Sequence, residues 1–497
     1  MNKLKLYIVT LITLFFVKAN GSIDFNNNCH QAFDDIIRLK LSKANNTLKS
    51  ELEKKPENAY ALYLVGLSEI IQVFISENQS HYKKLQVSIP RTIKLIEKFG
   101  GKSPYSQLFK GQLLFYYGAT QTKFEDFFSA GINMRDAYLV LKNNATKHPA
   151  FLPNSTIMGV IETFSGTVPA SFKWIIPLFG IKPSVANGVK KLEKFNNARV
   201  SPGSELENFK MEAKLFLGGL YHMVLHKEKE GWELIDNSTK DWKSNLFSTY
   251  MRASFLIKTG ENEEAIKVLS NRPIGKEYID LYHLDYLLGV CKLNRLDNDA
   301  DKSLINYITH FKGRNYLKSA LHKLSWYYLI KGDYTNYQLF LSKIPSTGFE
   351  FTDEDKQATK SVKEKYIPNI SLLRARLLFD GGYYDRALTE LSNKSTKNYS
   401  EYRDQVEFIY RLGRIYQKQG RGSVAITYFL KAISAGKNLP HYYAMASSIE
   451  IGKIYEEMND LANAKLYYKK ALTFTKNKEY MNSLEQKAKA GIDRVSK

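Results

Sequence analysis

Cysteine is nearly absent from this chain of 497 residues. The two cysteines, Cys29 and Cys291, are far apart, and no C-x-x-C or Cys/His spacing accompanies them. This excludes the common zinc-site motifs and a disulfide framework, whereas a single long-range disulfide between the two stays open. Proline, with 13 residues, and glycine, with 29, are also few for the length. Because both residue types interrupt helices, their scarcity leaves room for long ones.

The sequence also lacks the short motifs of common enzymes, such as G-x-S-x-G and G-x-G-x-x-G. The segment 101–103, Gly-Lys-Ser, is similar to the end of a phosphate-binding loop, but Ile96 stands where that loop needs glycine and Pro104 follows at once. We interpret Gly100 and Gly101 as a turn that ends a helix.

Histidines are few and dispersed. His222 and His226 are four residues apart and would share one face of a helix, but Met223 stands where a zinc protease needs glutamate. We therefore interpret both histidines as packing or surface residues. We predict that the protein is not an enzyme and has no cofactor and no metal site.

Positive charge dominates, with 72 basic against 50 acidic residues and a net charge of +22. Such a surface can suit nucleic acid, an acidic polymer or an anionic membrane. The lysines are scattered through the chain, however, and no long basic run occurs. This distribution favours a solvated lysine-rich surface and does not favour nucleic acid as the partner.

The first residues are typical of a secretory signal peptide. Lys3 and Lys5 precede an apolar run over 6–17, and the small residues Ala19 and Gly21 offer cleavage sites. A membrane-spanning helix needs about 20 apolar residues, so this run is short for one, although an uncleaved signal anchor stays open. We predict a signal peptide over 1–21 and export to the periplasm or cell surface of a bacterium.

The end of the chain contains a repeat, because two sets of residues recur with a spacing of 39 positions. Small and aromatic residues at fixed offsets indicate stacked helical hairpins. The first set is Gly413, Tyr416, Ala425, Phe429 and Ala432, and the second is Gly452, Tyr455, Ala464, Tyr468 and Ala471.

Each residue type in these sets has a structural interpretation. Gly413 and Gly452 lie where a side chain would collide with the second helix of the same hairpin, and the alanines let the helices approach. We expect the aromatic residues to fill the gap between successive hairpins. Gly420 and Asn459 fall where the chain must turn.

The pattern Leu-Gly-x-x-Tyr, then Ala, an aromatic residue and Ala, resembles the tetratricopeptide repeat. The resemblance implies an all-α fold, a right-handed superhelix of helical hairpins. Weaker copies of the pattern occur around Ala375 and Ala387, around Ala253 and Ala265, and near Ala44. We predict repeat-like hairpins over 22–149 and 201–400 and two clear repeats over 401–497.

Residues 150–200 break the pattern, and we predict an apolar helical insert there. The stretch 157–181 has the length to cross a bilayer, but Pro169, Pro177 and three glycines oppose a single lipid-exposed helix. It is either a buried plug or a contact with a membrane or an apolar ligand. Trp174 and Phe179 are the candidate contact residues for the second alternative.

Residues 126–195 also resemble a eukaryotic family of tetratricopeptide-repeat proteins, related to the yeast mitochondrial outer-membrane protein of inclusion-body clearance. The likeness lies in Gly159-Val160, Gly166, Val168-Pro169, Leu178–Gly180 and Gly188-Val189, although Ile181 stands where the family favours phenylalanine. It implies a scaffold without catalytic residues, with a link to membranes or lipid bodies.

These observations predict a non-enzymatic, exported scaffold for a protein or peptide partner. The alternative is a protein associated with membrane or lipid through residues 157–181.

Overall fold

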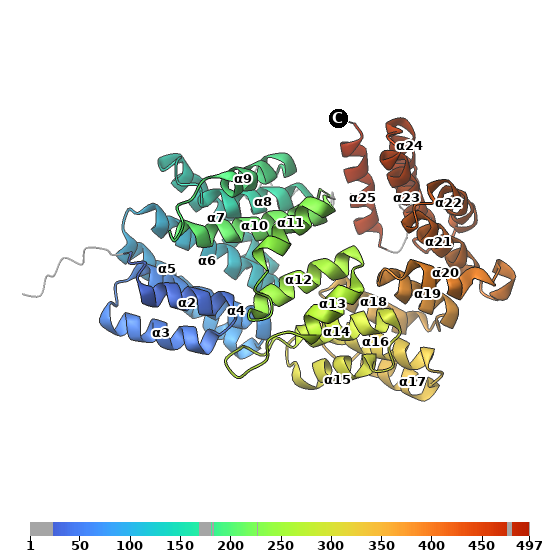
Figure 1. Ribbon diagram of the computed structural model, residues 1–497, viewed down its shortest axis with the longest axis horizontal. Coiled ribbons are helices and arrows are strands. Elements are labelled where there is room, and N and C mark those ends of the chain that lie inside the picture. The colour runs from blue at the N-terminus through green and yellow to red at the C-terminus, as the bar shows by residue number, and fades with distance from the viewer. Residues whose placement is uncertain (1–22, 168–179, 181–182, 226, 475–479, 497) are drawn as a thin grey trace, which may run out of the picture.

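The computed structural model describes residues 23–167, 180, 183–225, 227–474 and 480–496, and every regular element in these ranges is a helix. This confirms the predicted all-α array of tetratricopeptide-like hairpins (Figure 1). The signal-peptide prediction concerns residues outside these ranges.

Helices pair in chain order as antiparallel hairpins, each with a first and a second helix. The hairpins of the N-terminal half are α2 (Asn27–Ile37) with α3 (Leu41–Lys54), α4 (Ala59–Ser76) with α5 (Gln79–Gly100), α6 (Pro104–Lys123) with α7 (Phe127–Lys147), α8 (Asn154–Thr167) with α9 (Val185–Asn197), and α10 (Leu206–Met223) with α11 (Glu228–Ser238).

The C-terminal half continues the array, and two of its helices, α18 and the last helix α25, have no hairpin partner. Its elements are α12 (Leu246–Thr259) with α13 (Asn262–Ser270), α14 (His283–Arg295) with α15 (Ala300–His310), α16 (Leu317–Ile330) with α17 (Tyr334–Lys343), α18 (Asp353–Glu364), α19 (Ile370–Asp380) with α20 (Tyr384–Ser392), the short 3-10 helix Thr396–Asn398, α21 (Tyr402–Lys418) with α22 (Gly422–Gly436), α23 (Tyr443–Glu457) with α24 (Leu461–Ala471), the 3-10 helix Leu472–Phe474, and α25 (Met481–Arg494).

The turn inside the hairpins of this half has one geometry throughout. A residue in the left-handed region ends the first helix, and the next N–H donates to the carbonyl five residues back, as Arg421 N does to Tyr416 O at 2.9 Å. This bond satisfies a carbonyl that the helix end would leave unpaired. The left-handed residues are Gly260, Leu296, Gly332, Gly382, Gly420 and Asn459.

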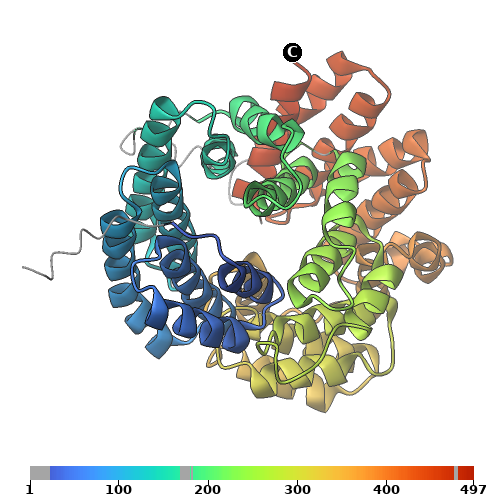
Figure 2. The ribbon, with the colours of Figure 1, turned by 60° about the vertical axis from the view of Figure 1, so that its left-hand side comes forward.

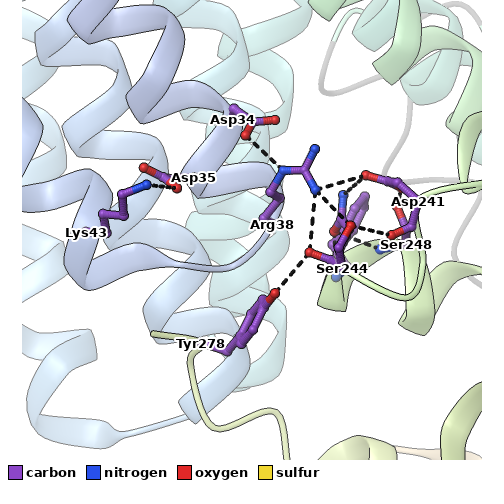
Figure 3. A network of polar contacts seen from close by, with 10 residues as sticks. Asp34, Asp35, Arg38, Lys43, Asp241, Ser244, Ser248 and Tyr278 are labelled. Carbon is purple, nitrogen blue, oxygen red and sulfur yellow. Dashed lines mark hydrogen bonds and ion pairs between the residues drawn. The ribbon is translucent and has the colours of Figure 1, made fainter. Parts of the chain in front are cut away.

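The chain coils until its first helices lie against the middle of the array (Figure 2). Ile279 N donates to Leu39 O at 2.9 Å, although 240 residues separate them in sequence. Arg38 Nη1 lies 3.2 Å from Ser244 Oγ and 3.5 Å from Asp241 Oδ2 (Figure 3). These contacts close the first superhelical turn.

A second contact between the same segments is buried. The Glu77 carboxylate accepts hydrogen bonds from the backbone N–H groups of Arg314 and Asn315, both at 2.8 Å, and pairs with Lys123 at 2.9 Å. Burial raises the pKa of Glu77, but the Lys123 charge and the hydrogen bonds outweigh it and leave the pKa below its usual value.

The segment predicted to interrupt the array contributes a hairpin to it. Helix α8 packs on α7, and α9 packs on α10. The two helices cross at Gly159 and Gly188, where a Cβ atom on Gly188 would lie 2.5 Å from Gly159 O. Trp174 and Phe179 lie outside the described residues, so their contacts stay a prediction.

Other sequence predictions have clear outcomes. Gly101 has φ +56° directly after the end of α5, which confirms the helix-ending turn. Both Cys29 and Cys291 are buried and free, and they belong to different apolar clusters, so the possible disulfide between them is absent. Within the described ranges, α4 is the one helix long and apolar enough to cross a membrane, and most of it is buried in the core.

Candidate binding face of the C-terminal repeats

The glycines of the repeat signature lie where the two helices of a hairpin cross. A Cβ atom on Gly413 would lie 2.7 Å from the Phe429 ring, and one on Gly452 would lie 2.8 Å from the Tyr468 ring. Both rings are fully buried. The predicted role of these glycines therefore agrees with the structure. The signature alanines are also fully buried at the packing surfaces: Ala425, Ala432, Ala464 and Ala471.

The signature tyrosines pack differently from the prediction. Tyr416 stacks on Tyr428 at 5.4 Å and Tyr455 on Tyr467 at 5.7 Å between ring centroids, and each pair lies within one hairpin. The expectation that these tyrosines mainly fill the gap between hairpins was therefore incomplete. Tyr416 does both, since its side chain also joins the apolar cluster shared with α19 and α20.

A pocket of about 70 Å³ lies where the unpaired helix α18 separates two hairpins. We call it the α18 pocket. Residues of five helices and of the linker 365–369 line it. They are His322 and Trp326 of α16, Tyr337 and Leu341 of α17, Gln357, Ser361 and Glu364 of α18, Tyr366, Pro368 and Asn369 of the linker, Leu372, Leu373 and Arg376 of α19, and Arg403 and Glu407 of α21.

Two cations lie on the indole ring of Trp326, and of the two Arg376 lines the pocket. Lys323 Nζ lies 4.0 Å and the Arg376 guanidinium 4.9 Å from the centroid of the Trp326 ring. Cations are attracted to the face of an aromatic ring, so the indole holds both of them in place. Burial, with the nearby charge of Arg376, lowers the pKa of Lys323 to about 7.

Charges elsewhere in the pocket are paired. Arg403 Nη1 lies 3.4 Å from Glu364 Oε2, and its guanidinium covers the Tyr366 ring at 4.1 Å. Glu407 accepts from Arg411 Nε at 2.7 Å and from the Tyr443 hydroxyl at 2.7 Å. These contacts fix part of the pocket wall.

Further cations continue along the first helices of the last hairpins. Arg414 lies 3.7 Å and Lys453 2.9 Å from the same carboxylate, Glu450. The pKa of Glu450 is held far below its usual value because these cations outweigh its burial. The pKa of Lys487 on α25 is lowered by burial and by the charge of Lys453. Charged groups therefore continue along the first helices from the pocket to the end of the array, and we call this charged surface the inner face.

The histidines considered for metal binding give no such site in the part of the chain that the structure describes. No group of three or more His, Cys, Asp or Glu residues there could hold a metal ion. His222 packs on Phe255, with 4.8 Å between ring centroids, and burial lowers its pKa. His226 lies outside the described residues.

Sequence reasoning missed the α18 pocket and the two cations on the Trp326 ring. Lys323, Trp326 and Arg376 belong to repeats that keep few signature residues, so their place on the inner face was not evident. The available signal was the helical spacing of Lys323 and Trp326, three residues apart, which places both on one side of α16.

Comparison with known structures gives distant likenesses. The human IFIT1 dimer with PPP-AAAA shares 13% identity, with 92% of this chain and 96% of that chain covered and a TM-score of 0.35. Yeast Tom70 shares 11% identity, with 92% and 86% covered and a TM-score of 0.25, and the Cut9 and Hcn1 hetero-tetramer of APC/C shares 12%, with 94% and 95% covered and a TM-score of 0.24. At these TM-scores the likenesses carry no argument about function.

At the level of sequence, none of the curated proteins compared with the chain matches it. The family described as tetratricopeptide repeat matches residues 406–435 and 447–478, the two hairpins whose glycines, alanines and aromatic residues have just been placed. The chain therefore contains two tetratricopeptide repeats, which α21 with α22 and α23 with α24 form.

Proposed function

We propose that this protein is a non-enzymatic, exported scaffold that binds a protein or peptide partner at the α18 pocket and the adjoining inner face. The observation that carries the proposal is the pocket itself. Five helices and a linker converge on it, and its volume of about 70 Å³ is below that of pockets that enclose a whole small molecule.

The lining of the pocket suits a peptide. Leu341, Leu372 and Leu373 supply an apolar floor, while Gln357 and Asn369 carry amide groups that can bond to a peptide backbone. Tetratricopeptide repeats serve as interaction scaffolds, so a peptide partner also agrees with the fold.

Support for a scaffold without catalysis comes from the state of the charged groups. Glu364 pairs with Arg403, and Glu407 accepts from Arg411 and Tyr443. Carboxylates engaged in this way hold the wall in place. Export is proposed from the n-region, the apolar run and the small residues of segment 1–21.

The binding proposal is tested by site-specific photo-crosslinking in the native cells. A photoreactive amino acid replaces Ser361 inside the pocket or Thr389, an exposed residue of α20, as the control. We expect a discrete protein or peptide adduct from position 361 and none from position 389. Equal crosslinking at the two positions, or none at 361, contradicts a binding site in the pocket.

Export has a separate test. A fusion of residues 1–21 to alkaline phosphatase, which is active only after export, should give active enzyme outside the cytoplasm. The control replaces Leu11 and Leu14 in the apolar run with arginine. Retention of the wild-type fusion in the cytoplasm contradicts export.

A further inference from the structure

We infer that the outer face of α5 is a docking surface for an anionic lipid bilayer. The surface consists of four exposed cations, Lys84, Arg91, Lys94 and Lys98, which we call the α5 stripe, and of apolar side chains beside them. The α18 pocket has no part in this surface, so the proposed partner site and the docking surface can be tested separately.

Helical spacing brings the α5 stripe together on one side of the helix. Its members, with Val87 among them, follow one another at steps of three or four residues. Because a helix rises 1.5 Å per residue, the stripe is about 21 Å long. The buried side of the helix, which packs on α4 and α6, carries Tyr82, Leu85, Ile89, Ile93 and Ile96. This apolar side fixes α5 in the array, so the stripe faces outward.

The cations of the α5 stripe have no acidic partner in the part of the chain that the structure describes. The one carboxylate on α5, Glu97, pairs with Lys110 of α6 at 2.5 Å. Second helices elsewhere in the array carry acids among their bases, as α13 does with Glu263 and Glu264 beside Lys267. The excess of positive charge on α5 is therefore a local feature of this helix.

Apolar side chains project from the same region. Val87, inside the stripe, is 72% exposed, and Phe128 and Ile132 of α7 are 78% and 37% exposed. The start of α7 lies beside the start of α5, because the Tyr82 hydroxyl donates to Asp126, the N-cap of α7, at 3.1 Å. Phe128 therefore lies near the N-terminal end of the stripe.

An anionic bilayer matches both parts of this surface. Its headgroups attract lysine and arginine side chains, and exposed apolar side chains can enter the boundary between headgroups and acyl chains. Exposed apolar groups beside polar ones mark interaction sites. The phosphates of a nucleic acid would also attract the cations, but they would leave the aliphatic Val87 and Ile132 in water. The combination of unpaired cations and projecting aliphatic groups thus favours lipid.

The first experiment measures vesicle binding by the mature protein, whose described fold begins at residue 23. Sedimentation with vesicles of phosphatidylcholine, alone or mixed with phosphatidylglycerol, gives the bound fraction. We expect binding to the anionic vesicles that weakens as salt increases, and little binding to the neutral ones. The triple variant Lys84→Gln, Arg91→Gln and Lys94→Gln should bind about a hundredfold more weakly, since each cation near an anionic surface contributes about fivefold.

A control triple variant removes the same charge elsewhere. Lys276→Gln, Lys302→Gln and Lys397→Gln change exposed lysines of the C-terminal half and should keep most of the binding. Equal losses in the two triple variants, or equal binding to neutral and anionic vesicles, overturn the inference. RNA that binds more tightly than anionic vesicles do, and through the same three cations, overturns it in favour of nucleic acid.

A second experiment reports which face touches the lipid. Both native cysteines are buried, so a polarity-sensitive dye can be attached to an introduced cysteine. On anionic vesicles the dye should shift its emission to the blue at Val87→Cys and not at Thr389→Cys, an exposed position of α20. Absence of the shift at position 87, or an equal shift at position 389, overturns the inference and leaves the α18 pocket untouched.

Discussion

Replacing Gly452 by alanine tests whether the repeat signature works by close helix crossing. The added Cβ would lie 2.8 Å from two atoms of the Tyr468 ring, a distance that real Cβ contacts do not show. Tyr468 is fully buried and its hydroxyl donates to Glu456 at 2.6 Å, so the ring cannot swing aside. Overpacking of this kind costs about 1–3 kcal/mol, whereas alanine in a helix gains about 1 kcal/mol over glycine. We expect a net loss of up to about 2 kcal/mol.

The measurement must be local, because a repeat array need not unfold in one step. Hydrogen exchange over α23 and α24 reports the opening free energy of that hairpin. Gly219→Ala in α10 is the matched control, since the nearest atom to its added Cβ is Met223 Cε at an ordinary 3.7 Å. The control should raise local protection, whereas Gly452→Ala should lower it.

A double-mutant cycle identifies the cause of the loss. Tyr468→Leu removes the ring that the new Cβ would strike, so Gly452→Ala should cost at least about 1 kcal/mol less in that background. Equal costs in the two backgrounds would refute the collision. If Gly452→Ala and Gly219→Ala changed the local hydrogen-exchange protection by the same amount relative to wild type, the position of the helix crossing at Gly452 would be wrong.

Three further outcomes follow from other sites. Gly188→Ala should destabilise α8 and α9 more than Gly452→Ala destabilises its hairpin, because the obstacle is the backbone of Gly159, and hydrogen exchange over both helices checks this. Glu77→Gln should raise the hydrogen-exchange rate of the Asn315 amide, because it removes the charged acceptor of that N–H. The pKa of Glu77 is lowered on folding, so the carboxylate stabilises the fold above about pH 4.5, and this stabilisation is lost as the pH falls through the lower folded pKa. A pH series of hydrogen exchange on the wild-type protein checks this. The pKa of Lys323 is about 7 in the folded protein against an ordinary value of 10.5, so between these pH values the unfolded chain binds more protons than the folded one. The free energy of opening of α16, measured by hydrogen exchange, should therefore increase with pH in this range, and Lys323→Met should remove the increase.

The sequence allowed the fold of the last two hairpins to be predicted because their determinants are local. Gly413 and Gly452 recur at a fixed offset from the aromatic rings that they face, and a collision within one hairpin depends on nothing outside it. The same holds for Gly420 and Asn459, whose left-handed conformation ends the first helix of each hairpin. The spacing of these residues in the sequence is therefore enough to predict the hairpins and their turns.

The partner of each aromatic ring was less predictable, even within one hairpin. The offset of Tyr416 places it on a packing surface but does not say which ring it meets, and the structure pairs it with Tyr428. Leu296 shows a related limit, because it occupies the left-handed turn position that glycine holds in other repeats. A leucine there gives no sequence signal of a turn, since its side chain disfavours that conformation.

The closed superhelical turn, and with it the rigidity of the inner face, depends on a sum over many repeats. Each hairpin adds a small rotation, so whether Glu77 reaches Asn315 is decided by all the hairpins between them. Once made, the buried contact and the one at Arg38 tie the first helices to the middle of the array. A solenoid held at both ends of a turn loses less conformational freedom when a partner binds. The prediction for Glu77→Gln therefore extends to the α18 pocket: if the closure preorganises it, the variant should bind peptide more weakly although no ligand touches residue 77.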